Sequence, residues 1–199
     1  MTGSTAGVVL AAGRSRRAGP VDKLTVEVEG EAMIRRVVRT ALEAGLDPVV
    51  VVTAGPGSGA HQAVRDLAVR TVVNPQADEG MGASVARGIG ALPGGVSGAV
   101  IVLGDMPWVR SSTIEALRRA FETAGAGLPL VPVHAERRGN PVLWPADRFP
   151  ALRALGGDVG ARSLLTRVGY RTVLVDDPGI HRDVDTPADL HTLDAPPST

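Results

Sequence analysis

The sequence predicts the α/β fold class, with a mainly parallel, twisted sheet flanked by helices in three layers. Short runs rich in Val, Leu and Ile alternate along the chain with longer stretches whose apolar residues recur three or four positions apart. The first pattern is typical of buried strands and the second of amphipathic helices. Because the two alternate, the chain should form βαβ units, which bind ligands at the carboxyl ends of their parallel strands.

The expected elements follow one another without a long break. The strands are expected at Gly7–Leu10, Val49–Thr53, Val69–Val73, Ala99–Leu103, Leu128–Val133 and Val173–Val175. The helices are expected at Ala32–Ala44, Ser58–Leu67, Gly82–Leu92 and Ser111–Ala124. Glycine pairs between these elements are too short for linkers and indicate turns. We expect one domain over all 199 residues, with residues 195–199 as a disordered tail.

The composition excludes several classes of function. The 21 basic residues balance 21 acidic ones, so no overall field favours nucleic acid or a membrane surface as a partner. The chain has no cysteine, which excludes disulfides and thiolate chemistry and leaves oxygen or imidazole as metal ligands. Its apolar runs are too short to span a bilayer, and Met1–Ala6 lacks the features of a signal peptide. We therefore expect a cytoplasmic protein.

The segment after the first expected strand is the most informative one. It reads Leu10-Ala11-Ala12-Gly13-Arg14-Ser15-Arg16-Arg17-Ala18-Gly19-Pro20-Val21-Asp22-Lys23. Small residues let backbone N–H groups approach phosphate oxygens, while Arg17 supplies a planar fork of donors and Lys23 a mobile charge. The segment suits a nucleoside triphosphate, although it lacks the GxxxxGK[ST] pattern of a Walker loop. A solvated basic turn is the alternative.

Two carboxylates are candidates for a metal site. Asp105 follows the strand expected at Ala99–Leu103, at the end where an open α/β sheet binds ligands. Magnesium prefers one or two carboxylates together with phosphate oxygens and water, and we expect Asp185 to be the second carboxylate. The alternative for Asp185 is to cap a helix over Pro187–Leu193. The alternative for Asp105 is a turn.

Two glycine-rich turns precede further helical stretches. The turn over Gly80–Ser84 places Gly82 and Ser84 where free N–H groups and a hydroxyl can meet a nucleobase or ribose. The segment from Gly156 to Arg162 either starts a helix capped by Asp158 or forms a lip over a second substrate. A plain helix start is the alternative for both segments.

Six segments, in order, resemble the molybdopterin nucleotidyltransferases, and more closely the cytidylyl branch of that family. The segments are LAAGRSRRAGPVDK, NPQADEGMGASVARGI, LGDMPWV, RRGNPVLWP, GGDVGARSLL and DVDTPADL. The resemblance implies a single Rossmann-like nucleotidyltransferase domain. It implies that Gly13, Arg17 and Lys23 hold the triphosphate, and that Asp105 and Asp185 bind Mg²⁺.

The resemblance also implies a reaction and its partners. The reaction is transfer of CMP from CTP to the terminal phosphate of molybdopterin, with release of pyrophosphate. Ser84 would help to recognise the base. From the residues themselves we expect the acceptor to contact Arg138, Asn140, Asp158 and Arg162, and a solvated charge pair is the alternative for Arg138 and its neighbour Arg137. We expect a monomer or weak dimer that makes transient contact with a molybdenum hydroxylase apoenzyme.

Three features depart from the cytidylyl pattern. Ala18 stands where Met is usual, and Asn140 replaces a common His. The spacing from Gly19 to Lys23 is that of the guanylyl branch. GTP as the nucleotide, and another phosphorylated compound as the acceptor, therefore stay open as alternatives.

Two functions of other classes also stay open. Gly55–Ala60 follows an expected strand and fits the GxGxxG/A pattern of NAD(P)H-dependent oxidoreductases, and some proteins with this overall pattern are described as oxidoreductases of nicotine breakdown. The match is weak because it follows the second strand, and because Asn74 stands where an acidic residue is expected. The other function is a non-catalytic escort that delivers a cofactor to a molybdenum hydroxylase. The two candidate metal carboxylates argue for catalysis over escort.

Overall fold

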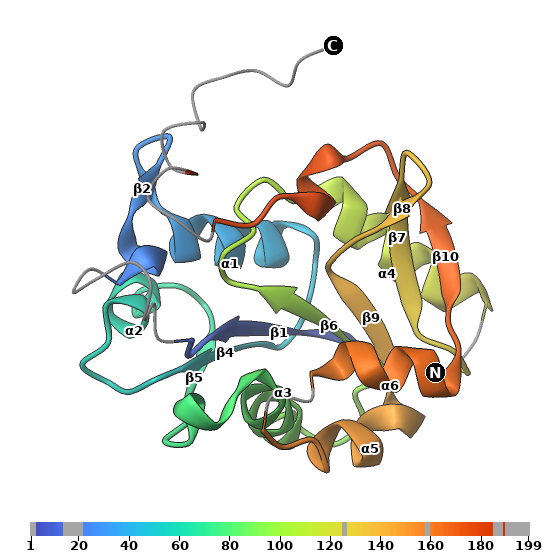
Figure 1. The fold of residues 1–199 in the computed structure, drawn as a ribbon, viewed down its shortest axis with the longest axis horizontal. Helices are drawn as coiled ribbons and strands as arrows, with labels where there is room; N and C mark the ends of the chain where they lie inside the picture. Colours follow the sequence, from blue (N-terminus) through green and yellow to red (C-terminus); the bar gives the residue numbers. More distant parts are fainter. Residues whose placement is uncertain (1–2, 14–21, 125–126, 158–159, 185–188, 190–199) are drawn as a thin grey trace.

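The computed structural model describes residues 3–13, 22–124, 127–157, 160–184 and 189 (Figure 1). Its middle layer is an eight-stranded sheet in the order β10-β7-β9-β6-β1-β4-β5, with β8 paired to β7. The strands of this sheet are β1 (Thr5–Ala11), β4 (Val49–Thr53), β5 (Arg70–Val73), β6 (Gly98–Leu103), β7 (Leu130–His134), β8 (Arg137–Arg138), β9 (Val142–Pro145) and β10 (Arg171–Leu174). A separate two-stranded sheet consists of β2 (Glu27–Val28) and β3 (Glu31–Ala32).

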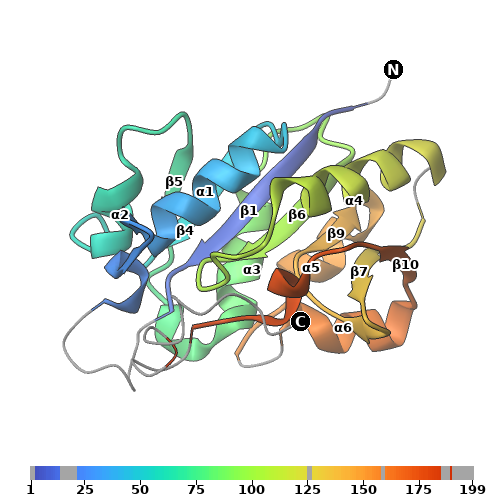
Figure 2. The ribbon, with the colours of Figure 1, turned by 90° about the horizontal axis from the view of Figure 1, so that it is seen from above.

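Helices cover both faces of the large sheet (Figures 1 and 2). The α-helices are α1 (Met33–Glu43), α2 (Gly59–Val64), α3 (Met81–Gly90), α4 (Ser111–Ala124), α5 (Phe149–Arg153) and α6 (Ala161–Val168). The 3-10 helices are η1 (Lys23–Thr25), η2 (Ala77–Glu79), η3 (Ala146–Arg148) and η4 (Pro178–His181). One hydrophobic core contains side chains of α1, α2 and α4, and the other contains side chains of α3, α5 and α6. The predicted three-layer α/β fold is confirmed.

The helix α1 and the strand β4 show how the sequence pattern produces these layers. In α1 the buried side chains recur at spacings of three and four residues, which puts them on one face of the helix. They are Met33, Ile34, Val37, Val38 and Ala41. In β4 all five residues are buried, because helices cover both faces of a parallel sheet.

Strand β9 departs from the parallel arrangement, as does the two-residue β8, which is antiparallel to β7. Strand β9 runs antiparallel to both β6 and β7, whereas β4 is parallel to β1 and β5, and β1 is parallel to β6. Our sequence analysis did not predict β9, because its four residues are all buried and end in a proline, so no alternation marks them. The reversal brings the first residue of β9 to the edge where the parallel strands end, since Val142 lies opposite Ile101 of β6.

The six predicted strands are present. The ends of β4 are as predicted, and at least one end of each of the other five is shifted. For example, β7 begins at Leu130 and β10 spans Arg171–Leu174. The helix expected over Ser58–Leu67 is only the six residues of α2, and α5 was not predicted. Apart from Asp189, the helix expected over Pro187–Leu193 lies outside the described residues, as does the tail at 195–199. No helix in the described part of the chain is long and apolar enough to cross a membrane.

The carboxyl ends of the parallel strands line up along one edge, which we call the carboxyl edge. Ala11 at the end of β1 lies opposite Thr53 of β4, and Leu10 lies opposite Leu103 of β6. The loops that follow β1 and β6, and the loop that precedes the reversed β9, therefore leave the sheet at the same edge. Ligands of open α/β sheets bind in this position.

Candidate active site at the carboxyl edge

Lys23 and Asp105 form an ion pair at the carboxyl edge. Lys23 Nζ donates to Asp105 Oδ2 at 2.9 Å and to the carbonyl oxygen of Val184 at 2.9 Å. The backbone N–H of Val184 donates in turn to the carbonyl oxygen of Asp105 at 2.9 Å. The structure thus brings together two residues that the sequence assigned to the site. It adds a backbone group from a third segment, which our sequence analysis missed because no local pattern marks it.

Asp22 fixes the turn that carries Lys23. Its Oδ1 accepts from the N–H of Leu24 at 3.2 Å, and its Oδ2 accepts from the N–H of Ala60 at 3.3 Å. A Cβ added to Gly59 would collide with the side chain of Thr25 and lie 3.2 Å from Asp22 Oδ2. The close approach of η1 to α2 therefore explains this glycine, and an intramolecular carboxylate occupies the first turn of α2.

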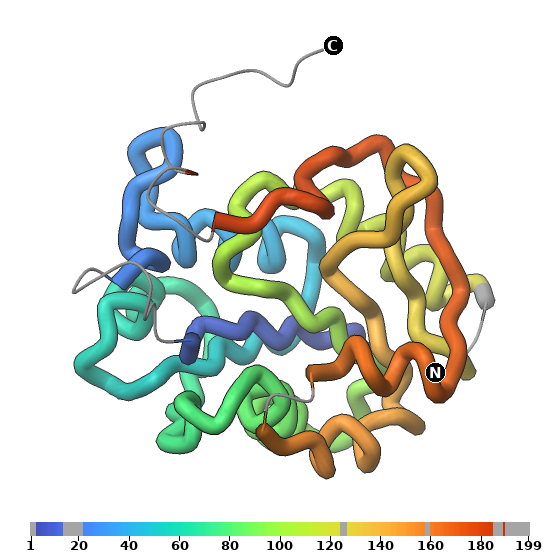
Figure 3. Tube along the Cα trace, viewed as in Figure 1, coloured from blue at the N-terminus to red at the C-terminus, as the bar shows by residue number. Residues whose placement is uncertain are grey.

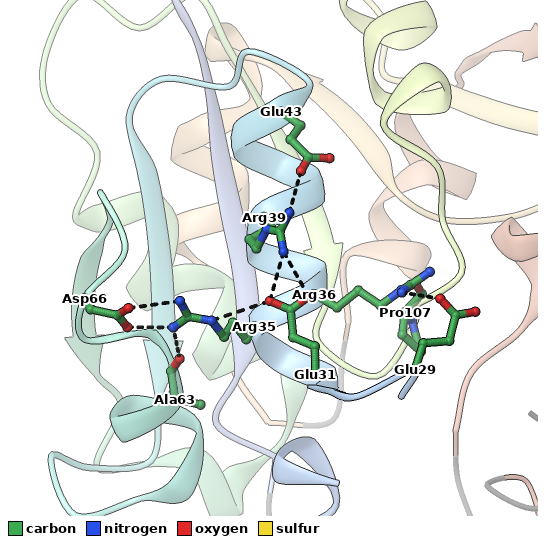
Figure 4. A network of polar contacts seen from close by, with 9 residues as sticks. All are labelled: Glu29, Glu31, Arg35, Arg36, Arg39, Glu43, Ala63, Asp66 and Pro107. Atoms are coloured by element: carbon green, nitrogen blue, oxygen red, sulfur yellow. Dashed lines mark hydrogen bonds and ion pairs between the residues drawn. The ribbon is translucent and has the colours of Figure 1, made fainter. Parts of the chain in front are cut away.

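The loop that carries Asp105 is held on two sides. On one side Arg36 of α1 donates from Nε to the carbonyl oxygen of Pro107 at 2.9 Å and from Nη1 to Glu29 Oε2 at 2.6 Å (Figure 4). On the other side, a Cβ added to Gly104 would lie 2.7 Å from the carbonyl oxygen of Leu10. Because β1 passes so close, the backbone leaving β6 has no room for a side chain at this position.

Gly13 differs from Gly104 in what surrounds it. Among the described residues, no atom lies within 4 Å of a Cβ added to Gly13, and its φ lies outside the left-handed region. Neither the packing of these residues nor the backbone conformation therefore requires a glycine here. A glycine at position 13 would also leave space for a ligand to approach the backbone closely.

The oxygens around Lys23 fit a divalent cation of the kind expected. Asp105 Oδ2 and the carbonyl oxygen of Val184 converge on one cationic atom, and the Asp105 side chain remains 25% exposed. Oxygen donors are the ligands that Mg²⁺ and Mn²⁺ prefer. Within the described ranges no three His, Asp or Glu side chains gather as a metal site, so a cation bound by these residues would need further ligands from substrate and water.

A cavity of about 320 Å³ lies between α3 and α6 at the same edge of the sheet. Much of its wall is apolar and comes from strand residues such as Leu10, Leu103 and Trp144. The lining also contains Arg138, Asn140 and Arg162, which are three of the four residues predicted to bind the acceptor. An apolar cavity with a few polar groups is typical of a small-molecule site.

Arg138 is oriented by a residue that our sequence analysis did not select. Its Nη1 donates to the hydroxyl of Tyr170 at 2.6 Å, and its guanidinium lies 5.0 Å from the centre of the same ring. Tyr170 is the single tyrosine of the chain. No motif surrounds it, so only the fold reveals that it faces Arg138.

The residues predicted to meet the base already have partners within the protein. Ser84 is buried, and its hydroxyl accepts from Asn74 Nδ2 at 3.0 Å. The backbone N–H of Gly82 donates to the carbonyl oxygen of Gly157 at 3.1 Å. The Ser84 hydroxyl keeps its own proton for donation, whereas the Gly82 N–H is occupied in this arrangement.

Five predicted site residues lie outside the described residues. They are Arg14, Ser15, Arg17, Asp158 and Asp185. The hypothesis that Asp158 caps the following helix is nevertheless wrong, because the N-cap residue of α6 is Gly160. The chain enters the helix two residues later than the capping hypothesis required.

Comparison with known proteins finds a matching family model and several relatives of similar sequence. The family model described as the MobA-like NTP transferase domain matches residues 7–173. The chain is 32% identical to purine catabolism protein PucB of Bacillus subtilis over 192 residues, covering 91% of each protein. It is 28% identical to nicotine blue oxidoreductase of Paenarthrobacter nicotinovorans over 194 residues, covering 94% of this chain and 95% of that protein. A probable molybdenum cofactor guanylyltransferase of Opitutus terrae is 35% identical over 120 residues, covering 58% of this chain and 54% of that protein.

Solved structures extend the likeness over nearly the whole chain. The crystal structure of Rv0371c from Mycobacterium tuberculosis superposes with a TM-score of 0.83 at 29% identity, covering 97% of this chain and 98% of that one. A complex of the same protein with manganese gives a TM-score of 0.80 at 27% identity, covering 96% and 97%.

Proposed function

The chain belongs to the MobA-like NTP transferase family and is a nucleotidyltransferase, and on this premise we propose that it transfers CMP from CTP to the terminal phosphate of molybdopterin. The family resemblance predicted from six sequence segments agrees with this membership. The observation that carries the proposal is the Lys23–Asp105 ion pair, which stands beside Val184 at the carboxyl edge. GTP in place of CTP is the alternative favoured by the guanylyltransferase relative.

The N-terminal loop is proposed to hold the triphosphate. Lys23 would leave Asp105 to contact phosphate oxygens, and Arg17 would offset further negative charge. Gly13 supports this role because the described residues leave space beside its backbone. Backbone groups of the remaining loop residues would complete the contacts. These residues are Leu10, Ala11, Ala12, Arg14 and Ser15.

A magnesium ion is proposed to bind between Asp105, Asp185 and the substrates. Val184, the chain neighbour of Asp185, is hydrogen-bonded to the backbone of Asp105, which supports the pairing of the two carboxylates. The manganese complex of Rv0371c is consistent with a divalent cation in this fold. When bound, such a cation neutralises phosphate charge and orients the reacting groups.

The acceptor is proposed to enter the cavity between α3 and α6. Arg138 and Arg162 supply positive charge for its phosphate, and Asn140 supplies an amide at the same wall. Asp158 is included from the sequence alone. The apolar strand residues suit a planar heterocycle such as a pterin, and another phosphorylated compound is the alternative acceptor.

The reaction follows from this arrangement of charges. An oxygen of the acceptor phosphate attacks the α-phosphorus, a new P–O bond forms, and the bond from the α-phosphorus to the bridging oxygen breaks to release pyrophosphate. The attacking phosphate is already ionised and needs no strong base. Catalysis therefore depends on alignment of the two substrates and on offsetting their charge. Ser84, with the turn at Gly82, is proposed to form the wall near the base.

An oxidoreductase is the second candidate because the nicotine blue oxidoreductase relative spans nearly the whole chain. The local structure gives this candidate less support. Its glycine motif precedes a helix of six residues, and the Asp22 carboxylate accepts from the N–H of Ala60 where a pyrophosphate would be expected. Gly59 in the motif is explained by its contact with η1.

Pyrophosphate release tests these proposals. The protein is assayed with CTP, GTP, ATP or UTP and Mg²⁺, with and without molybdopterin. Release that requires both CTP and molybdopterin supports the cytidylyl proposal, and preference for GTP moves the enzyme to the guanylyl branch. Failure with every triphosphate, in the presence of active molybdopterin, contradicts the proposed acceptor. Binding of NADPH in that case favours the oxidoreductase.

A further inference from the structure

A segment near the C-terminus crosses the carboxyl edge and touches both halves of the candidate site. We call residues 175–184, which include η4, the strap (Figures 1 and 3). At its start the N–H of Val175 donates to the carbonyl oxygen of Val133 at 3.0 Å. At its end the N–H of Val184 donates to the carbonyl oxygen of Asp105 at 2.9 Å. The strap therefore joins the β7 side of the sheet to the loop that carries Asp105.

The strap is fixed in its middle by a buried carboxylate. Asp177 is 1% exposed. Its Oδ1 accepts from the N–H of Gly179 at 2.9 Å, and its Oδ2 accepts from the N–H of Arg110 at 2.9 Å and from Thr113 Oγ1 at 2.7 Å. Three donors compensate the cost of burying the carboxylate. The two Oδ2 contacts attach the strap to the first turn of α4.

Two glycines show how closely the strap packs against both half-sites. A Cβ added to Gly179 would collide with the backbone carbonyl of Trp108, in the loop after Asp105. A Cβ added to Gly139 would collide with the carbonyl oxygen of Ile180, in the strap. The N–H of Asn140, whose residue lines the acceptor cavity, donates to that same oxygen at 3.1 Å.

The end of the strap is held by an aromatic contact. The guanidinium of Arg182 lies 4.3 Å from the centre of the Trp108 ring, which is within the range of a cation–π interaction. Two residues later, the carbonyl oxygen of Val184 accepts from Lys23 Nζ. The position of Val184 relative to Lys23 and Asp105 therefore depends on how the strap sits on the loop after β6.

We infer that Asp177 is a positioning residue that sets the metal and nucleotide half of the site through the strap, and that the strap links this half to the acceptor cavity. The inference rests on the proposed function. Asp177 touches neither Lys23 nor Asp105 in the contacts described above, and it acts through Gly179 and α4. Loss of its charge should let Val184 move away from Lys23.

The test is metal affinity in the full-length protein. Binding of Mn²⁺ is followed by electron paramagnetic resonance in the presence of CTP or GTP, for the wild type, Asp177→Asn and Asp176→Asn. Asparagine keeps the shape of Asp177 but puts an N–H₂ group toward backbone or hydroxyl donors. Removal of a group that orients metal ligands typically costs roughly 10–100-fold in metal affinity, and we expect about tenfold for Asp177→Asn. Asp176 is the matched control, since its side chain is 99% exposed, and it should change affinity by about twofold or less.

A milder pair of variants covers the case in which Asp177→Asn does not fold. Thr113→Val removes one donor to Asp177 and keeps the shape of the side chain. Thr123→Val is its control on α4, because Thr123 Oγ1 donates to the carbonyl oxygen of Arg119 on the same helix. Thr113→Val should weaken Mn²⁺ binding by about threefold, and Thr123→Val should not.

The outcomes separate three conclusions. A folded Asp177→Asn or Thr113→Val variant that binds Mn²⁺ as the wild type does overturns the positioning role. A lower melting temperature with unchanged affinity means that Asp177 serves stability alone. A wild type that binds no Mn²⁺ with either nucleotide contradicts the proposed function itself, and the positioning role falls with it.

Discussion

The ion pairs Lys23–Asp105 and Arg35–Asp66 have similar lengths but very different surroundings. The first has an Nζ–Oδ2 distance of 2.9 Å, and the second has an Nη1–Oδ1 distance of 2.6 Å. Arg35 also donates to the second oxygen of Asp66 and to the carbonyl oxygen of Ala63, within the polar network on α1 (Figure 4). Within the described ranges, Lys23 Nζ donates to one oxygen of Asp105 and to the backbone carbonyl of Val184, both at the carboxyl edge.

The comparison teaches that the ion pair with more hydrogen bonds, Arg35–Asp66, is the one expected to have a structural role. A bidentate pair satisfies both partners within the protein and leaves little for a ligand. The Lys23–Asp105 pair is less exposed, with 18% and 25% of the side chains accessible, compared with 31% and 62% for Arg35–Asp66. A lysine ammonium is a point charge, so it can exchange a carboxylate for a phosphate without breaking a planar fork of hydrogen bonds. We therefore expect the position of an ion pair and its ability to exchange partners, more than its length, to distinguish a pair that acts on substrate.

The largest effect is expected for Lys23→Ala. Removing a preorganised charge that contacts the reacting phosphates should lower kcat/KM for pyrophosphate release by about a hundredfold or more. Circular dichroism should show a folded protein. Arg35→Ala is the matched control, because it removes the cation of the other pair, which contacts Ala63 of α2 and Asp66. Activity of Lys23→Ala close to that of the wild type would contradict the assignment of the site.

Smaller effects are expected for alanine substitutions of Gly13 and Gly104, and the two variants should differ in which property they change. Gly13→Ala should leave the melting temperature unchanged and weaken triphosphate binding by about tenfold, since misplacing a substrate by about 1 Å can cost up to ~100-fold in rate. Gly104→Ala should instead destabilise the fold by about 1–3 kcal/mol, because its Cβ would press on β1. Thermal unfolding and CTP or GTP titration measure the two effects. A Gly13→Ala variant that loses stability and keeps its affinity for the triphosphate would contradict the proposed ligand role of Gly13.

The smallest effect is expected for Asp66→Asn. The hydrogen bond from Arg35 lowers the pKa of Asp66 below its ordinary value. A carboxyl whose pKa is lowered by folding contributes stability above its unfolded pKa, and this contribution is lost as the pH falls through the folded pKa. The variant should therefore melt slightly lower than the wild type at pH 7, and the two should converge under strongly acidic conditions. Added salt at pH 7 should also reduce the difference.

Local patterns were sufficient for much of the fold. The runs at Val49–Thr53 and Ala99–Leu103 are strands in the structure, because a continuous β-branched or apolar run between turn residues is marked by sequence alone. They were insufficient for β9, which is short, wholly buried and followed by 3-10 turns. They also overextended α2, which ends at Val64. Just before this end the carbonyl oxygen of Ala63 accepts from Arg35 of α1, and just after it the N–H of Leu67 bonds back to Val64.

The sequence alone identified Lys23 and Asp105 as site candidates, because each belongs to a short segment that follows a strand. It also selected Arg138, Asn140 and Arg162, which the structure collects around one cavity. It did not identify Tyr170 or Asn74, which orient Arg138 and contact Ser84. Tyr170 lies 32 residues from Arg138 and shares no pattern with it. Asn74 lies only ten residues before Ser84, in the same sequence segment, but nothing in that segment marks the two side chains as hydrogen-bond partners.

The sequence by itself determined the alternation of strands and helices, the strand-end position of Asp105 and the basic loop after β1. These features depend on residues that are near one another in the chain. Only the tertiary structure decided that the Val184 carbonyl meets Lys23 and that Asp177 fixes the strap to α4. Such contacts follow from the order of strands in the sheet and from the reversal of β9. The periodicity of a single segment predicts neither the strand order nor the reversal of β9, because packing between distant segments determines both.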